Sequence, residues 1–163
     1  MSTKTKKPTE QVEHDHLLFA VRHGKYIDEE KVLDETGKEQ SEFLGRTILN
    51  MICKDQKSIV MTSNLPRAQE TGTIIAKILN SPAVSEEILE IDSYYMSSVL
   101  YSPIKSFTDE YDVVIVVTHF ESPSGIMDAF CSELFKGSFP RTVITNGNGF
   151  VLNLTNGLVK QIF

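Results

Sequence analysis

Two arginines and two histidines stand at places where apolar runs of the sequence end. They are Arg22, His23, Arg67 and His119, half of the four arginines and half of the four histidines in the chain. The planar guanidinium of arginine presents a fork of donors that suits the oxygens of a phosphate group. An imidazole among such cations is pushed towards its neutral form, which is a nucleophile that can attack phosphorus. These residue types therefore indicate a phosphate pocket with a histidine nucleophile.

The triplet Arg22-His23-Gly24 allows three interpretations when it is taken alone. It fits a surface turn formed by chance, a metal ligand, or a catalytic group at the end of a strand. Gly24 would let the backbone approach a ligand closely, because glycine has no side chain. Helix N-termini that follow these strand ends would add backbone donors for an anion. We favour the catalytic interpretation because Arg67 and His119 also follow apolar runs.

Runs with the periodicity of strands alternate with runs that have the periodicity of helices. The predicted strands are 17–22, 58–63, 88–91 and 112–119, and the predicted helices are 34–52, 66–80, 97–107 and 122–135. Residues 149–163 are predicted to form a hairpin with Asn156 and Gly157 in its turn. This order predicts an α/β fold, which we expect to be a three-layer α/β/α sandwich with a mostly parallel central sheet.

The sequence indicates capping residues and an apolar side for some of the predicted helices. We expect Asp34 or Thr36 to cap the first helix, and Ser122 to cap the last one with Pro123 in its first turn. The apolar side of the first helix is predicted to hold Phe43, Leu44, Ile48 and Ile52. The run 112–119 holds five consecutive valines or isoleucines, which is typical of a strand covered on both faces. In such sheets ligands bind beyond the carboxyl ends of the strands, where the site is therefore expected.

The composition is that of a globular protein, with 40% hydrophobic and 23% charged residues. We expect a flexible polar tail over residues 1–16 and a single domain over 17–163. No run approaches the roughly 20 apolar residues of a membrane-spanning helix, and the polar start has no signal-peptide region. The formal net charge of -6 argues against nonspecific binding to nucleic acid or to an anionic membrane.

Some remaining residues are given structural interpretations. Cys53 and Cys131 are far apart in apolar helical stretches, so each is predicted to be a small buried hydrophobic residue. A cytoplasmic location is the expectation that follows from this use of cysteine. Residues 93–96 could line the rim of the pocket or pack in the core, and core packing is the favoured prediction. The pair His14 and His16 resembles a metal-binding pair, but a flexible tail is a poor setting for a metal.

The chain resembles the histidine phosphatase superfamily, also called the phosphoglycerate mutase-like family, in the stretches VRHGK, LDETGKEQSEFLG, TSNLPRAQET and VVTHF. These stretches stand in the order and spacing of that family, over about residues 18–163. The Arg-His-Gly triplet and the pattern of Ser63, Arg67, Ala68 and Thr71 form a strong signal together. The resemblance implies a phosphoglycerate mutase-like fold. Because the chain is short, it looks like a compact member similar to the bacterial phosphohistidine phosphatases.

The resemblance also implies roles for the site residues. His23 would be the nucleophile that becomes phosphorylated and is then released by water, with its other ring nitrogen held by a backbone carbonyl. Arg22, Arg67 and His119 would bind the phosphoryl oxygens and stabilise the transferring group. Glu90, in the stretch ILEID, matches the general acid that protonates the leaving group.

Gly24 and Lys25 complete the substrate-binding residues that we expect beside Arg22, Arg67 and His119. Lys25 stands where many members of the family have an acidic residue. Glu121 follows the second histidine closely, and its carboxylate would repel a phosphate unless it turns away or meets a cationic substrate. The resemblance implies no metal and no cofactor.

The function implied is that of a metal-independent phosphatase with a phosphohistidine intermediate on His23. Its partner would be a phosphorylated substrate, either a phosphoprotein, phosphohistidine among the candidates, or a small phosphomonoester. Neither nucleic acid nor a membrane is an expected partner, and the oligomeric state is not predicted. Two alternatives remain open: a non-catalytic phosphate-binding regulatory module, and a phosphoglycerate-type mutase, against which the short chain argues.

Overall fold

The computed structural model describes residues 13–162, and its strands form one sheet in the order β3-β2-β4-β1-β5-β6. The strands are β1 Leu17–Arg22, β2 Ser58–Thr62, β3 Ala83–Ser85, β4 Val113–Thr118, β5 Gly149–Asn153 and β6 Val159–Ile162. Neighbouring strands are parallel from β3 to β1, whereas β5 pairs antiparallel with both β1 and β6. The predicted mostly parallel sheet and the predicted C-terminal hairpin are confirmed.

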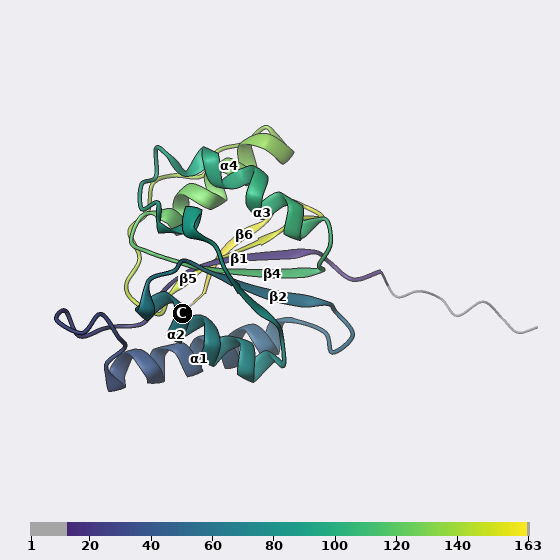
Figure 1. Ribbon diagram of the computed structural model, residues 1–163. Helices are drawn as coiled ribbons and strands as arrows, with labels where there is room; N and C mark the ends of the chain where they lie inside the picture. Colours follow the sequence, from purple (N-terminus) through teal and green to yellow (C-terminus); the bar gives the residue numbers. More distant parts are fainter. Residues whose placement is uncertain (1–12, 163) are drawn as a thin grey trace, which may run out of the picture.

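Helices cover both faces of this sheet (Figure 1). The α-helices are α1 Glu35–Met51, α2 Pro66–Leu79, α3 Tyr101–Thr108 and α4 Ser122–Phe135, and two 3-10 helices, η1 Glu87–Glu90 and η2 Ser97–Leu100, lie before α3. Figure 1 shows α1 and α2 on one side of the sheet and α3 and α4 on the other. The predicted three-layer α/β/α sandwich is thereby confirmed.

The core lies on the two faces of β4, and every residue of this strand is buried. Successive side chains of a strand point to opposite faces. Val114 and Val116 accordingly join the apolar cluster beneath α4, while Val113, Ile115 and Val117 join the cluster beneath α1 and α2. This double burial explains why β4 reads as an unbroken apolar run rather than an alternating one.

The strand predicted over residues 88–91 is wrong, because Glu87–Glu90 form the 3-10 helix η1. Leu89 is fully buried there, and Ile88 and Ile91 pack against the same cluster. Residues three apart share one side of a 3-10 helix, so an apolar run of this length satisfies the core without a strand. The strand that pairs with β2 is instead Ala83–Ser85, which the sequence reading missed.

The predicted cap of α1 is confirmed, because Asp34 accepts a 2.7 Å hydrogen bond from the backbone N–H of Gly37. The apolar side of α1 was only partly predicted. Leu44 and Ile48 are buried, but Phe43 is 60% exposed. One residue of a helix turns by about 100°, so Phe43 lies outside the buried side centred on Leu44.

The predicted cap of α4 is wrong. Ser122 is the first residue of the helix rather than its cap, and Glu121 occupies the cap position without a side-chain bond to the helix. The Ser122 hydroxyl instead donates to the backbone carbonyl of Ile91 at 2.5 Å. The serine therefore ties α4 to the segment that follows η1.

The predicted tail over residues 1–16 falls largely on residues 1–12, which lie outside the described part. Within that part, His14 Nε2 lies 2.8 Å from Asp55 Oδ2, and Gln56 donates to the carbonyl of Asp15 at 2.7 Å. Residues 14–16 thus make polar contacts with the domain.

Two further expectations concern burial and the membrane. Cys131 is buried as predicted, whereas the prediction for Cys53 is wrong, because it is exposed just beyond the end of α1. Among residues 13–162 no helix combines the length and the apolar character needed to span a membrane.

Candidate active site

Three parallel strands bring the predicted site residues to one edge of the sheet. In the ladder between β1 and β4, Arg22 pairs with Thr118, so His23 and His119 follow at the same level. The centroids of the two imidazole rings are 5.3 Å apart. The carboxyl ends of parallel strands meet at one edge, which is where ligands bind in sheets of this kind.

The His23 imidazole is buried and held at both of its ring nitrogens. Nδ1 lies 2.8 Å from the carbonyl oxygen of Gly24, as the resemblance implied, and Arg67 Nε donates to Nε2 at 3.0 Å. A carbonyl can only accept and a guanidinium can only donate, so Nδ1 carries the proton and Nε2 carries the lone pair. Burial, and then the nearby His119, Arg67 and Arg22, lower the pKa of His23 to about 4. His23 is therefore a neutral imidazole with its nucleophilic nitrogen turned towards Arg67.

Arg67 lies in the first turn of α2, directly after Pro66 at the helix start. Besides its bond to His23, its guanidinium lies over the ring of Tyr26, 4.5 Å from the ring centroid. Glu70, one turn further on, accepts a 2.6 Å hydrogen bond from the backbone N–H of Leu33. This arrangement leaves the Arg67 side chain at the site rather than in an ion pair along the helix.

His119 directly follows β4, as His23 directly follows β1. Its Nε2 lies 3.0 Å from the hydroxyl of Ser63, which follows β2, and its ring is almost completely buried. Burial is the largest cause that lowers the pKa of His119 to about 4, and Arg67 and Arg22 lower it further. A neutral imidazole beside a serine hydroxyl can present one N–H donor, and protonation would give it a second.

Arg22 ends β1 and points its guanidinium across the edge of the sheet. One terminal nitrogen donates to the carbonyl of Ile144 at 2.8 Å, and the group lies 4.8 Å from the centroid of the Phe120 ring. Burial lowers the pKa of Arg22 from its usual value. Within residues 13–162, the buried side-chain nitrogens without a hydrogen-bond partner are Arg22 Nε and His119 Nδ1. Unpaired buried polar atoms are costly, and these two nitrogens are free to donate to a ligand at this edge of the sheet.

The structure explains the need for glycine at position 24 by packing within the protein, whereas the prediction was close approach of the backbone to a ligand. A Cβ on Gly24 would overlap the backbone of Gly37 at the start of α1, so glycine is needed where the two segments pack. The backbone N–H of Gly24 donates to the hydroxyl of Thr71 at 3.0 Å, and that hydroxyl donates to the carbonyl of Arg67 at 2.9 Å. Thr71 therefore connects the residue after His23 with Arg67, the arginine that contacts the His23 ring.

Lys25 and Glu90 lie further from these contacts. Lys25 has an exposed ammonium group 3.8 Å from a carboxylate oxygen of Asp34, at the start of α1. Glu90 is exposed at the end of η1, and no polar contact of its carboxylate is seen within the described residues. Their parts in substrate binding and in acid catalysis stay predictions.

Two site residues were missed by the sequence reading. Asn146 donates to the carbonyl of His23 at 3.1 Å from the segment before β5, where no motif marks it. Tyr26 packs edge-on to His23, with ring centroids 5.3 Å apart, and stands only three residues after it. Proximity in sequence was the one signal that could have identified Tyr26.

The prediction that residues 93–96 pack in the core is wrong for two of them. Tyr95 is 77% exposed and Met96 is 56% exposed.

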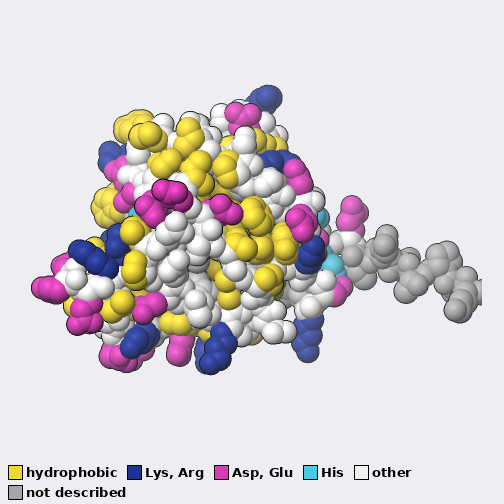
Figure 2. Space-filling model, viewed as in Figure 1, with side chains coloured by type: hydrophobic (Ala, Val, Ile, Leu, Met, Phe, Trp, Pro, Cys, Tyr) yellow, Lys and Arg dark blue, Asp and Glu magenta, His cyan; other side chains and the backbone are white. Residues whose placement is uncertain are grey.

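Figure 2 shows hydrophobic side chains beside Lys and Arg side chains at the end of the molecule where β1 leads into α1. Phe120, beside Arg22, is 41% exposed at the same edge of the sheet.

Comparison with solved structures identifies the arrangement of strands and helices. SixA of Agrobacterium tumefaciens superimposes with a TM-score of 0.63 at 18% identity, over 93% of this chain and 98% of that one. The protein histidine phosphatase SixA in complex with tungstate also gives 0.63, at 19% identity, over 90% of this chain and 94% of that one. The chain has the fold of the histidine phosphatase superfamily. The resemblance carried by the four sequence motifs is thereby confirmed at the level of the fold.

The histidine phosphatase fold is accompanied by one partial match in sequence. Over 78 residues the chain is 42% identical to the mitochondrial serine/threonine-protein phosphatase Pgam5 of Caenorhabditis briggsae. The match includes 45% of this chain and 26% of the relative, so it spans about a quarter of that protein's length. No protein-family model matches the chain.

Proposed function

We propose that this protein is a metal-independent phosphatase that acts through a phosphohistidine intermediate on His23. The observation that carries the proposal is the tautomer of the neutral His23 ring. The carbonyl of Gly24 holds the proton on Nδ1, so Nε2 holds the lone pair. A pKa of about 4 keeps this nitrogen unprotonated at neutral pH. SixA, which has the same fold, binds tungstate, a tetrahedral oxyanion of the same shape as phosphate.

The geometry supports a two-step transfer. When a phosphoryl group enters, Arg67 exchanges its bond to His23 Nε2 for a bond to a phosphoryl oxygen. The Nε2 lone pair then forms a bond to phosphorus while the bond from phosphorus to the leaving group breaks. Arg22, Arg67 and His119 stabilise the charge on the phosphoryl oxygens. Water attacks the phosphohistidine in the second step, which releases phosphate and returns neutral His23.

The leaving group determines how much acid catalysis is needed. An alkoxide is a poor leaving group and must be protonated, for which Glu90 is the proposed donor. A phosphoramidate such as phosphohistidine needs less assistance from an acid. The proposed substrates are therefore a phosphoprotein, which includes phosphohistidine, or a small phosphomonoester.

Hydrolysis of an aryl phosphate in the presence of a chelator tests the proposal. The variant His23→Ala should lose turnover by at least about a thousandfold while it keeps the fold. His16→Ala is the matched control, because His16 lies near Asp112 before β1, at the other end of the sheet. Full activity of His23→Ala would disprove the proposed nucleophile.

A substrate panel then tests the acid. Wild type and Glu90→Gln are compared on a phosphohistidine peptide, a sugar phosphate and an aryl phosphate. We expect ester hydrolysis to fall in the variant while phosphoramidate hydrolysis persists. Equal loss on all substrates, or no loss, would reject Glu90 as the acid.

A second candidate is a non-catalytic phosphate-binding module. The observation that favours it is the bond from Arg67 to His23 Nε2, which covers the nucleophilic lone pair. Such a module would bind inorganic phosphate or a phosphopeptide in calorimetry but would show no turnover and no phosphorylated histidine by mass spectrometry.

A further inference from the structure

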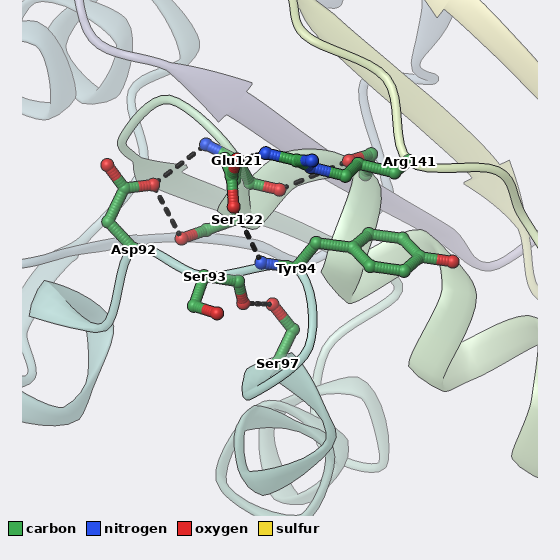
Figure 3. Close-up of polar contacts among 8 residues, drawn as sticks. Asp92, Ser93, Tyr94, Ser97, Glu121, Ser122 and Arg141 are labelled. Atoms are coloured by element: carbon green, nitrogen blue, oxygen red, sulfur yellow. Dashed lines mark hydrogen bonds and ion pairs between the residues drawn. The ribbon is translucent and has the colours of Figure 1, made fainter.

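Asp92 connects two segments that border the phosphate pocket. Its Oδ1 accepts a 2.7 Å hydrogen bond from the backbone N–H of Glu121 and lies 3.4 Å from the hydroxyl of Ser122 (Figure 3). Asp92 follows η1, whereas Glu121 ends the turn between β4 and α4 and Ser122 begins α4. The carboxylate thus holds the start of α4, where a negative charge is favourable.

The connection is reciprocal. Glu121 Oε2 accepts a 3.3 Å hydrogen bond from the backbone N–H of Tyr94, and the other oxygen of the same carboxylate pairs with Arg141. Figure 3 shows the carboxylates of Asp92 and Glu121 each reaching towards the backbone of the opposite segment. Each segment therefore fixes the position of the other, and Arg141 neutralises the carboxylate that lies closer to the helix.

The turn held in this way carries His119, two residues before Glu121. The charged and titratable groups that act on the His119 ring are Arg22 and His23 at the end of β1, Arg67 in α2, and Asp92. Burial, Arg67 and Arg22 lower the pKa of His119, whereas Asp92 raises it. Asp92 is thus the anion in this set. It lies where its charge favours a proton on His119.

That proton matters to phosphate binding. His119 Nε2 lies beside Ser63, and Nδ1 is buried without a partner within the described residues. A protonated imidazole donates from both nitrogens, so it can keep the serine and also donate to a phosphoryl oxygen. The negative charge of phosphate adds to that of Asp92 and favours the same form.

We propose that Asp92 is a positioning residue of the phosphate pocket, which fixes the β4–α4 turn so that His119 can donate from both ring nitrogens, one to Ser63 and the other to a phosphoryl oxygen. The inference rests on the proposed function, because it assigns Asp92 a part in binding the phosphoryl group at that site. Asp92 acts through His119 and the turn, which distinguishes it from Glu90, the proposed acid two residues before it.

The experiment separates the charge of Asp92 from its hydrogen bond. Asp92→Asn keeps an oxygen acceptor without the charge, and Asp92→Glu keeps the charge. Glu87→Gln is the matched control, because Glu87 is an exposed carboxylate of η1. Binding of inorganic phosphate is measured by calorimetry between pH 5 and 8. The His119 ring is titrated by NMR in the free and in the phosphate-bound protein.

Asp92→Asn should bind phosphate roughly three- to tenfold more weakly near pH 6, where the bound phosphate favours the protonated form of His119. The difference should be smaller at pH 8, where the ring stays neutral even in the phosphate complexes of both proteins. Its His119 should titrate at a lower pH than in wild type. Asp92→Glu should restore most of both properties, and Glu87→Gln should match wild type. Ionisation of the phosphate itself is common to all variants and cancels in the comparison.

The inference is overturned if Asp92→Asn and wild type titrate and bind alike, or if Glu87→Gln changes them equally. Asp92→Ser replaces Asp92→Asn should the latter fail to fold. If wild type binds phosphate but never hydrolyses an ester or a phosphoramidate, the proposed catalysis fails while these comparisons still decide the role of Asp92. If wild type does not bind phosphate, both proposals are rejected.

Discussion

Arg67 Nε and His23 Nε2 form a 3.0 Å hydrogen bond, so the group expected to bind the phosphoryl oxygens also protects the proposed nucleophile before substrate arrives. The bond makes the lone pair on Nε2 inaccessible to a proton and keeps the guanidinium close to the place where phosphate would bind. In the proposed mechanism phosphate competes for the same guanidinium, and its entry frees the nitrogen that is proposed to attack.

Replacing Arg67 should therefore change His23 as well as phosphate binding. We expect Arg67→Met to lower kcat/KM by about 10²–10³, the usual effect of losing one donor to transition-state charge. The pKa of His23 should rise, because Arg67 is among the groups that lower it. Kinetics with an aryl phosphate and an NMR titration of the His23 ring measure the two effects. Arg46→Met, an exposed arginine of α1, should leave both unchanged.

Stability should fall as the solution is acidified through the range in which the two buried histidines become charged. His23 and His119 have pKa values of about 4 in the folded protein and 6.5 as the ordinary value. The unfolded chain therefore binds more protons between these values, so their contribution is complete above pH 6.5 and is lost as the pH falls to 4. Each contributes a slope of up to about 1.4 kcal/mol per pH unit.

Urea unfolding at several pH values between 4.5 and 7.5 measures this slope. The double variant His23→Asn, His119→Asn should show a shallower dependence, because asparagine does not titrate. An identical slope in the double variant would mean that other groups cause the loss of stability.

Adding one methyl group at Gly24 should damage the site, because a Cβ there overlaps the backbone of Gly37. Overpacking of this kind costs about 1–3 kcal/mol, and relief of the overlap would move the residue after His23. We expect Gly24→Ala to lower both the Tm and kcat/KM. Gly137→Ala is the control, because its Cβ would make only an ordinary contact, 3.9 Å from the carbonyl oxygen of Cys131. Equal behaviour of the two variants would contradict the packing argument.

Removal of the Thr71 hydroxyl should weaken the link between the Gly24 backbone and α2. Thr71→Val keeps the shape but leaves the Gly24 N–H without its acceptor, at a cost of about 1–3 kcal/mol. The exposed Thr73 of the same helix provides the matched variant Thr73→Val, which should stay close to wild type. Denaturation midpoints and hydrogen exchange of the Gly24 amide measure the difference.

Sequence patterns predicted the fold wherever local and tertiary signals agree. The unbroken apolar run of β4 and the carboxylate of Asp34 before α1 are local features that the tertiary structure uses directly. β3 could not be found in this way, because three residues with mostly exposed side chains become a strand only through backbone bonds to β2. The sequence of η1 was mistaken for a strand because a buried leucine is compatible with either a strand or a 3-10 helix.

The same reasoning applies to the site. The places of Arg22, His23 and His119 were predictable, because Arg22 ends a strand and the two histidines directly follow strands whose burial the sequence makes plain. Asp92 was not, since its importance arises from contact with a turn that is 29 residues away along the chain. Asn146 likewise approaches His23 only because β5 runs next to β1.

The pairing of Arg22 with Thr118 means that the geometry of the pocket depends on the register between β1 and β4. A strand advances by about 3.3 Å per residue and alternates its faces, so a slip by one position would carry His23 away from His119 and turn its ring to the other side. The spacing of the two imidazoles is thus determined by the alignment of the apolar residues of β1 with the valines and the isoleucine of β4. Substitutions there that leave the protein folded can still misplace His23 by a full residue step.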